Sequence, residues 1–417
     1  MAEQFDVAIL GAGPIGLEAA LRAGEEGRRT VLLDRGGPAA NVREWGHVRL
    51  FTPFEMNSSP RGRAAVADIP DGERHQTGQE FADEYLGPLA EAVERRGVDV
   101  RTGCVTDVHR LGWPKGRGLG DAAREAAPFA VEVDDERLMA DVVLDCTGTF
   151  AGSSRQTWDF CRPQEYPVTP PAVDPAEVSW GPLDAAAIDP AWQHASVLVV
   201  GSGYTAATDV VILHAAGVPV VWLTRRDTPR PIDLIEDDPL PRRRELVTQA
   251  NTLATSGKVD WRPGHTLASV QFAPPAARPP YVRRDVVAIG PEGEVRFEGR
   301  RAMAAVLLDT GFRPDTSLFR ELHVHLCYAT EGPMKLAAHL MGQSSADCLD
   351  QSGNDADLLR TPEPGFFVLG SKSYGRRSNF LLKAGIEQVD AVFDELIPPH
   401  PGSTADAVPP PLGEQGA

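Results

Sequence analysis

The 417-residue sequence has only five cysteines, and no two of them have the C-x-x-C or C-x-x-x-x-C spacing of a redox-active pair. They are Cys104, Cys146, Cys161, Cys327 and Cys348. So few, widely spaced cysteines do not suggest a disulfide framework in a reducing compartment. Electron transfer through a thiol pair is also disfavoured, because two sulfurs must meet for it.

The sequence also lacks a long apolar run and an excess of positive charge. No segment approaches the roughly 20 apolar residues of a membrane helix, and the acidic start is unlike a secretory signal. The formal net charge of −18 repels phosphate backbones, which argues against nucleic acid as a partner. We therefore expect a cytoplasmic protein that binds neither membrane nor nucleic acid.

A dinucleotide-binding pattern opens the chain. Residues 5–10 predict a strand, residues 15–26 a helix and residues 30–33 a second strand. Between the first two lies the G-x-G-x-x-G loop Gly11-Ala12-Gly13-Pro14-Ile15-Gly16. Its glycines allow a sharp turn, a close pyrophosphate and tight helix packing, and the helix N-terminus attracts phosphate. Asp34, followed by Arg35, ends the second strand and can accept hydrogen bonds from ribose hydroxyls.

The pattern recurs in the middle of the chain. Gly201-Ser202-Gly203-Tyr204-Thr205-Ala206 follows an expected strand at 196–200 and opens a helix. The next strand ends in Arg225 and Arg226 instead of an acid. Guanidinium groups bind a 2′-phosphate, so this pair favours NADPH over NADH. The alternative is a solvated surface pair and a protein that uses NADH.

Together the two patterns resemble those of the two-dinucleotide-binding-domain flavoproteins. The segments Asp141-Val142-Val143-Leu144-Asp145-Cys146-Thr147-Gly148 and Leu308-Asp309-Thr310-Gly311-Phe312-Arg313-Pro314-Asp315 share in the resemblance. It implies an α/β fold of two Rossmann-like domains, with the NADP domain inserted in the FAD domain. FAD would bind at the first loop and NADPH at the second. The implied divisions are 1–155 and 306–397 for FAD and 156–305 for the linker and NAD(P) domain. Independently of the resemblance, residues 398–417 have several prolines and no apolar run, which predicts a disordered tail.

The resemblance also implies cofactor residues outside the two loops. Thr147, Gly148 and Gly311 would lie at the crossovers between domains, and Gly370 and Ser371 at a late flavin-binding position. Many relatives have Gly-Asp at that position, so the usual aspartate contact is missing here. Lys372, Arg376 and Arg377 would bind anionic groups or lie on the surface, and the polar segment 373–379 is a candidate site loop.

Residues 44–63 resemble the flavin-facing segment of flavin-containing monooxygenases. Trp45, Pro53 and Asn57 occur in the familiar order. The match implies that Trp45 contacts the flavin and that Asn57 lies near a flavin peroxide, with Arg49 as a second candidate catalytic residue. The alternative for Asn57 is a turn residue that caps the backbone.

The resemblance favours a monooxygenase that uses FAD, NADPH and O2 to oxygenate nitrogen or sulfur in a small metabolite. The F-x-G-x-x-x-H signature is absent after Phe150, which disfavours a Baeyer–Villiger reaction. A flavin-dependent oxidase or dehydrogenase stays open, as does a redox-inactive flavin-binding partner protein, and a homodimer is compatible with the sequence. His323, His325 and Cys327 would share one face of a strand, where such ligands suit zinc or copper. We expect a plain polar strand face instead, and therefore no metal.

Overall fold

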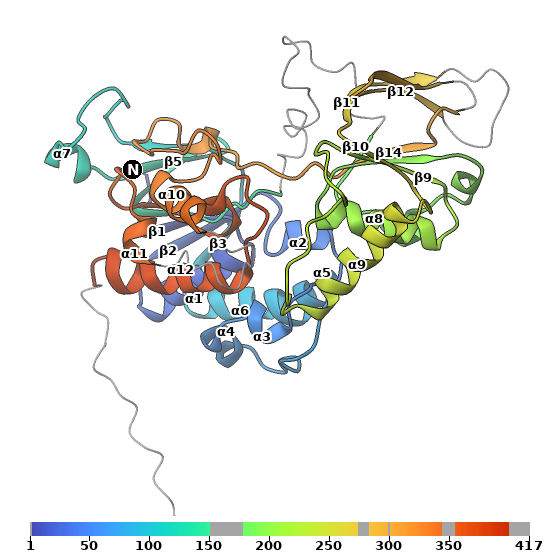
Figure 1. Cartoon of the computed structure of the whole chain (residues 1–417). Coiled ribbons are helices and arrows are strands. Elements are labelled where there is room, and N and C mark those ends of the chain that lie inside the picture. The colour runs from blue at the N-terminus through green and yellow to red at the C-terminus, as the bar shows by residue number, and fades with distance from the viewer. Residues whose placement is uncertain (1, 151–177, 274–282, 299–300, 344–354, 400–417) are drawn as a thin grey trace, which may run out of the picture.

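The computed structural model describes residues 2–150, 178–273, 283–298, 301–343 and 355–399. Two lobes lie side by side, each built around its own sheet (Figure 1). The first sheet takes strands from both ends of the chain, and the second takes them from the middle. The prediction of an α/β fold with two Rossmann-like domains, one inserted in the other, is confirmed.

The first sheet has the order β3-β2-β1-β6-β5-β4, and β15 pairs with β6. The strands β1, β2, β3, β6 and β15 are parallel, while β5 and β4 form an antiparallel extension. The nearly continuous apolar runs of β1 and β2 suit strands that are buried on both faces. The bounds are β1 (Gln4–Leu10), β2 (Thr30–Asp34), β3 (Asp99–Thr102), β4 (Val105–Arg110), β5 (Phe129–Val133), β6 (Glu136–Asp145) and β15 (Phe366–Val368).

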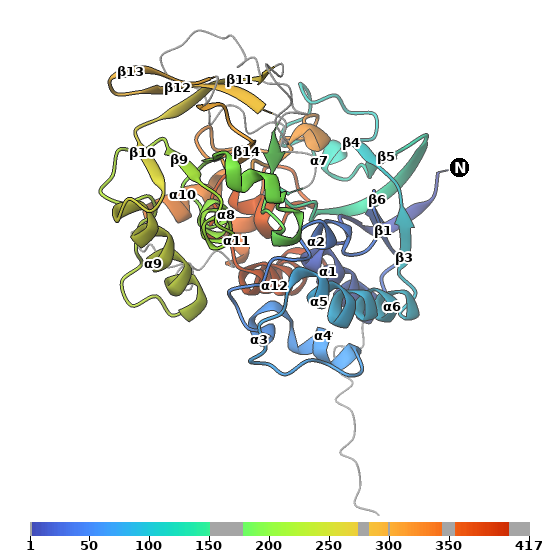
Figure 2. The same cartoon turned by 90° about the vertical axis from the view of Figure 1, so that its right-hand side faces the viewer.

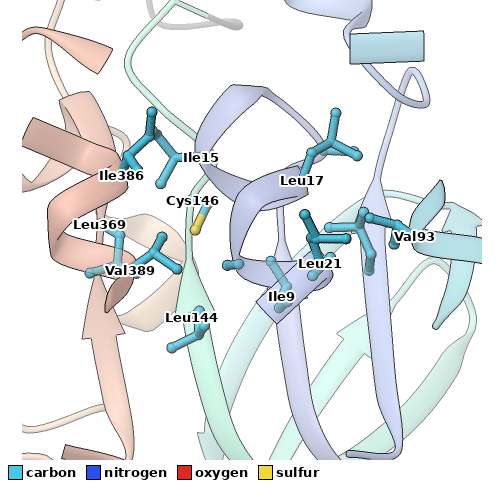
Figure 3. Packing of buried hydrophobic residues seen from close by; sticks show 14 of the residues in the cluster. Ile9, Ile15, Leu17, Leu21, Val93, Leu144, Cys146, Leu369, Ile386 and Val389 are labelled. Carbon is cyan, nitrogen blue, oxygen red and sulfur yellow. The ribbon is translucent and has the colours of Figure 1, made fainter. Parts of the chain in front are cut away.

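Helices α1 (Pro14–Glu25), α6 (Gly87–Arg95) and α12 (Leu382–Ala391) share one core on this sheet. Figure 3 shows Ile15 of α1 beside Ile386 of α12, with Cys146 between the helices and the sheet. Helix α12, which is far from α1 in the sequence, therefore completes the core that supports the first glycine-rich loop. Within the described residues, no helix has both the length and the apolar composition that crossing a bilayer requires.

The second sheet is parallel and has the order β10-β9-β8-β14-β7. One face packs on α8 and α9, and the other packs on a small antiparallel sheet, β11-β12-β13, which lies above it in Figure 2. The bounds are β7 (Ser179–Trp180), β8 (Val197–Val200), β9 (Val220–Thr224), β10 (Asp260–Pro263), β11 (Thr266–Ala273), β12 (Arg283–Gly290), β13 (Gly293–Phe297), β14 (Ala305–Leu308), α8 (Tyr204–Ala215) and α9 (Pro241–Thr255).

The connecting segments carry shorter helices. They are α2 (Ala40–Glu44), α3 (Phe54–Asn57), α4 (Pro60–Ala65), α5 (Gly78–Phe81), α7 (Ala122–Glu125), α10 (Met334–Gly342) and α11 (Ala356–Leu359). Single π-helical turns at Ala82–Leu86 and Val392–Leu396 adjoin α6 and α12. Short 3-10 turns lie at Ala185–Ala187, Pro190–His194, Ser317–Phe319 and Gly370–Tyr374.

Two sequence expectations need adjustment. Because β14 belongs to the second sheet and ends at Leu308, we place the return to the first domain after Leu308 rather than at 306. The expected strand through His323 and Cys327 is wrong. This segment folds back on the next few residues, and its backbone is also held by Glu363, to which the His323 N–H donates at 2.9 Å.

The other boundary predictions stay predictions. The predicted domain boundary at residue 155 and the part of the predicted tail from residue 400 onward lie outside the described residues. Pro398, where the predicted tail begins, is described, and its carbonyl accepts a hydrogen bond from Arg28 at 2.8 Å. The described part of the chain has no cluster of three or more His, Cys, Asp or Glu that could hold a metal.

Candidate functional site

The carboxyl ends of β1, β6 and β15 meet at one edge of the first sheet. The Cys146 N–H donates to the Leu10 carbonyl at 2.8 Å, and the Leu369 N–H donates to the Asp145 carbonyl at 3.0 Å. Open α/β sheets bind ligands at this edge, outside the carboxyl ends of the strands. The predicted cofactor residues that follow these three strands are Gly11, Gly13, Thr147, Gly148, Gly370 and Ser371.

The first glycine-rich loop has the geometry that its sequence predicts. Gly11 has a φ of +95°, and a Cβ there would lie 2.6 Å from the Cys146 carbonyl oxygen. A Cβ on Gly16 would lie 1.7 Å from the Gly11 oxygen. At Gly13, in contrast, a Cβ would meet no protein atom within 4 Å. Gly13 is the N-cap of α1 and no side chain caps this helix, so the first-turn N–H groups face open space that a phosphate can fill.

The other residues of the first loop fix the start of α1. Pro14 is its first residue, where the missing N–H costs nothing. Ile15 is buried, and Cβ atoms added to Gly370 and Gly385 would lie 3.2 and 2.6 Å from its side chain. These glycines let the late segments of the chain close onto the helix N-terminus.

Asp34 lies at the end of β2 and is half-buried. One carboxylate oxygen accepts the Ala12 N–H at 2.9 Å, and the other accepts the Gly36 N–H at 2.8 Å. The carboxylate thus orders the loop, and each oxygen keeps a lone pair for a ribose hydroxyl. Arg35 is exposed beside it.

The second loop repeats this geometry at the edge of the second sheet. Gly201 has a φ of +142°, and a Cβ there would lie 2.2 Å from the backbone carbonyl oxygen of Asp309. A Cβ on Gly203 would meet nothing within 4 Å. Gly203 is the N-cap of α8, which also has no capping side chain. The two helices therefore present matching, uncapped N-termini.

The residues that follow Gly203 join the helix to its surroundings. Tyr204 begins α8 and packs edge-on against Phe51 of the first domain, with ring centroids 5.6 Å apart. Thr205 lines the cavity described below, and Ala206 is fully buried. The second loop is thus in contact with the first domain.

Arg225 and Arg226 follow β9 and are both exposed. The Arg226 guanidinium donates to Asp233 at 2.7 Å. An exposed pair of this kind adds little stability, so this contact orients Arg226 without withdrawing it from a ligand. Both arginines line the cavity described below, and their binding of a 2′-phosphate stays a prediction.

A cavity of about 690 Å³ lies between the two domains. It reaches from the second loop and the arginine pair to Thr149 and Ser371 of the first domain. The crossovers pack on each other nearby, with the rings of Phe150 and Phe312 5.1 Å apart. The predicted site residues that line the cavity are Gly201, Gly203, Tyr204, Thr205, Arg225, Arg226, Gly311 and Ser371. The cavity is large enough to hold the reacting halves of two ligands.

The polar segment 373–379, a candidate site loop from the sequence, supplies the opposite wall. Arg376, Arg377, Ser378 and Asn379 line the cavity together with Phe380. Sequence reasoning missed several further lining residues of the second domain, namely Ile232, Asp233, Leu234, Ile235 and His265. They lie in loops without a motif, so no local signal identifies them.

No residue of the predicted flavin-facing segment 44–63 lines the cavity, although Phe51 packs against Tyr204, which does. The Asn57 amide accepts from the Thr52 hydroxyl at 2.6 Å and donates to the Thr52 carbonyl at 3.1 Å. This closed pair is the arrangement of a turn residue. Arg49 is exposed and reaches Glu80, and the Trp45 ring lies against Gly78. The catalytic roles of Asn57 and Arg49 and the flavin contact of Trp45 stay predictions.

Lys372 is a buried residue, which corrects the surface position considered from its sequence. Its ammonium group donates to Asp145 at 2.7 Å and to the Thr147 hydroxyl at 2.8 Å. The Thr147 hydroxyl in turn donates to the other Asp145 oxygen at 2.7 Å. Removing one partner would leave an uncompensated buried charge. This pair therefore fixes the crossover turn at Thr147 beneath the late segment of the chain.

A second buried pair lies under the second loop, between α8 and the end of β14. Burial raises the pKa of Asp209 to about 7, and burial together with the adjacent Asp209 raises that of Asp309 well above its ordinary value. The Leu183 N–H donates to one Asp209 oxygen at 3.0 Å. Two carboxylates this close cannot both ionise at low cost, so the pair holds a shared proton.

This acid pair predicts a stability that falls as pH rises. In the unfolded chain both groups lose their protons near pH 4, whereas in the folded chain Asp209 keeps its proton to about pH 7. The native state thus binds more protons between these values, and its free energy of unfolding decreases with pH across that window. We expect the thermal unfolding midpoint of Asp309→Asn to fall less than that of the natural protein between about pH 4 and pH 7, as measured by calorimetry.

Asp227→Asn is the control, since it removes an exposed carboxylate from the same domain. It should leave the pH dependence unchanged. A parallel decline in Asp309→Asn and the natural protein would show that the two carboxyls do not share a proton.

No protein-family model matches the chain. Its structure is similar to that of bacillithiol disulfide reductase Bdr from Bacillus cereus, with a TM-score of 0.63 and 17% identity over 95% of this chain and 99% of that one. It is also similar to a thioredoxin reductase from Lactococcus lactis (TM-score 0.56, 17% identity, 94% and 98% coverage). A flavin-containing monooxygenase from Stenotrophomonas maltophilia has a TM-score of 0.54 and 20% identity, with 94% and 98% coverage.

At these identities the likeness shows the fold. Nearly the whole chain shares the fold of these proteins, which agrees with the two Rossmann-like domains that the glycine-rich loops predict. Proteins named for disulfide reduction and for monooxygenation share this architecture. The reaction must therefore be argued from the residues of this chain.

Proposed function

We propose that the chain is an FAD- and NADPH-dependent oxidoreductase, and specifically a monooxygenase that oxygenates nitrogen or sulfur in a small metabolite. One observation carries the proposal: two uncapped, glycine-lined helix N-termini stand at the edges of separate sheets, and one cavity extends from the second to the turns beside the first. This arrangement suits two dinucleotides whose reactive ends meet between the domains. The names of the structural neighbours are consistent with it.

The residues around the first loop fit FAD. The open space before Gly13 would hold its pyrophosphate against the N–H groups of α1, and Asp34 would accept ribose hydroxyls. Gly148 and Ser371, which lie beside each other, would face the ring system. When bound, FAD would take a hydride from NADPH and pass the electrons to oxygen. The aromatic side chains of Phe312 and Phe380 would restrict water in the cavity.

The second loop fits NADPH for the same steric reason. Gly203 leaves room for a pyrophosphate, and Arg225 and Arg226 lie where β9 ends, the position that contacts the adenosine ribose in this fold. A 2′-phosphate would receive charge-assisted hydrogen bonds from these guanidinium groups.

Replacing both arginines tests the choice of nucleotide. We expect Arg225→Ala with Arg226→Ala to raise the KM for NADPH roughly 10- to 100-fold, because about 1.5–3 kcal/mol of charged hydrogen bonding is lost. The KM for NADH should change little, since NADH has no 2′-phosphate. Initial rates of flavin reduction with each nucleotide measure both values. An equal rise for the two nucleotides would refute the 2′-phosphate assignment.

The described cysteines give a thiol route little support. Cys104 is exposed, and Cys146 and Cys327 are buried; all three are free. Burial, with the neighbouring Asp145 adding to it, raises the pKa of the Cys146 thiol. A protonated, buried thiol is a poor nucleophile. Oxygen is therefore the proposed electron acceptor in place of a disulfide.

The fate of oxygen tests the monooxygenase assignment. Purified holoprotein would be supplied with NADPH and air and with a panel of amines, amino acids and thioethers, while NADPH use, hydrogen peroxide and oxygenated product are measured. We expect at least one compound to divert NADPH oxidation from peroxide to product. Stoichiometric peroxide release with every compound would favour an oxidase.

A further inference from the structure

Arg377 lines the cavity but has no role in the proposed binding of FAD or NADPH. It is half-buried, and it lines the cavity from the side of the first domain. Among the residues that the structure describes, its guanidinium has no hydrogen-bond or ion-pair partner. A guanidinium stays charged under all ordinary conditions. One that is half-buried and unpaired on a cavity wall therefore attracts an anion.

The backbone before Arg377 is held in one conformation. Gly375 has a φ of +64°, and a Cβ there would lie 2.1 Å from the backbone carbonyl oxygen of Thr330. The Arg376 N–H donates to that same oxygen at 2.7 Å. Close packing of this kind fixes the direction of the chain as it enters the cavity wall. Arg377 is thus presented by a constrained loop, which lowers the entropy lost when a ligand binds.

The neighbouring Arg376 already binds a carboxylate of the protein. The Arg376 guanidinium donates to both oxygens of Glu331, at 2.8 Å each, and Arg313 donates to the same carboxylate at 2.5 Å. These three side chains form a closed cluster. The cluster keeps one net positive charge, but both of its guanidiniums are bound to Glu331, whereas Arg377 has no carboxylate partner among the described residues.

The other anionic groups expected in the cavity already have partners. A 2′-phosphate would use Arg225 and Arg226, and a pyrophosphate would use the N-terminus of α8. The cavity lining also includes Phe380 and Thr310, whose hydroxyl has no hydrogen-bond partner among the described residues. Such a wall suits a small molecule with an anionic end, an apolar stem and one further polar group.

We propose that Arg377 binds the carboxylate of the substrate, so that the substrate class is small carboxylic acids that carry the oxygenated nitrogen or sulfur. Simple amines and sulfides would then be poor ligands. This inference rests on the proposed function, because it assigns the remaining space in the cavity to the substrate.

Matched ligand pairs test the inference by equilibrium binding to the oxidised holoprotein. Calorimetry would compare L-lysine with cadaverine, and L-methionine with its decarboxylated amine. We expect at least one carboxylate to bind roughly tenfold or more tightly than its partner. Arg377→Leu should abolish this difference and Arg377→Lys should keep part of it, while Arg117→Leu, which removes an exposed arginine outside the cavity, should keep it all.

Three outcomes would overturn the inference. In the first, neither carboxylate binds more tightly than its amine, or Arg377→Leu binds them as the natural protein does. In the second, inorganic phosphate binds more tightly than both carboxylates, which assigns Arg377 to a phosphorylated ligand. In the third, Arg377→Leu loses FAD or binds NADP⁺ more weakly, which assigns the residue to a cofactor. Failure of the proposed function would appear separately, as a natural protein whose flavin NADPH does not reduce.

Discussion

Gly13→Ala gives a folded protein that does not retain FAD. An added Cβ meets no protein atom within 4 Å, and alanine readily adopts the φ of −78° found at this position. The substitution therefore costs the fold little. The methyl group would instead occupy the space where a pyrophosphate approaches the N-terminus of α1. We expect the dissociation constant for FAD to rise roughly 100-fold, equivalent to about 2.7 kcal/mol of binding, so that FAD is lost during purification.

Flavin absorbance and thermal unfolding measure the two effects separately. Gly116→Ala is the matched control, because its Cβ also meets nothing within 4 Å but its loop is exposed and outside the cavity. It should keep its flavin. Gly11→Ala should fail differently, by losing structure, since its Cβ would collide with backbone. A yellow Gly13→Ala protein with equimolar FAD would contradict the assignment of the first loop.

Gly203→Ala should keep its flavin and lose its reduction by NADPH. The residue is the N-cap of α8, with a φ of −97° that alanine tolerates and with no atom within 4 Å of an added Cβ. A methyl group here would exclude the pyrophosphate of NADPH and would leave the FAD site unchanged. We expect the second-order rate of anaerobic flavin reduction by NADPH to fall roughly 100-fold, about 2.7 kcal/mol.

Reduction of the same variant by dithionite is the internal control, and it should proceed at the normal rate because it needs no nucleotide site. Unchanged reduction by NADPH would mean that the nucleotide binds elsewhere. Together with Gly13→Ala, this variant separates the two loops: one loses the flavin and the other loses the electron donor.

The two loops could be predicted from sequence because their requirements are local. Gly11 and Gly201 have positive φ values and backbone atoms in the space that a Cβ would fill. A strand before each loop and a helix after it complete a unit of fewer than about 35 residues. Asp34 and Arg225 also follow from position alone, because each comes after the strand next to its loop.

The buried charge pairs could not be predicted, because their partners are far apart in the chain. Lys372 meets Asp145 only after β15 pairs with β6. In the same way, Asp209 meets Asp309 only when β14 pairs with β8. In sequence these residues are single charges with no periodic pattern, and Lys372 was therefore open to the wrong interpretation as surface charge.

The small sheet β11-β13 was missed for a different reason. Its strands alternate in polarity, but the pairing of β11 shifts register between Leu267 and Ser269. A bulge of this kind breaks the two-residue period by which a half-buried strand is recognised. The cavity depends on this part of the chain too, because His265, Thr266 and Leu267 line it.

The most direct test of the account is anaerobic addition of NADPH to the purified, FAD-loaded protein. If the cavity joins an NADPH site at Gly201 to an FAD site at Gly11, the flavin absorbance will bleach with equimolar NADPH, and admission of oxygen will restore it. A flavin that dithionite bleaches but that excess NADPH and NADH leave oxidised would contradict the central claim that this fold passes electrons from a nicotinamide nucleotide to a flavin.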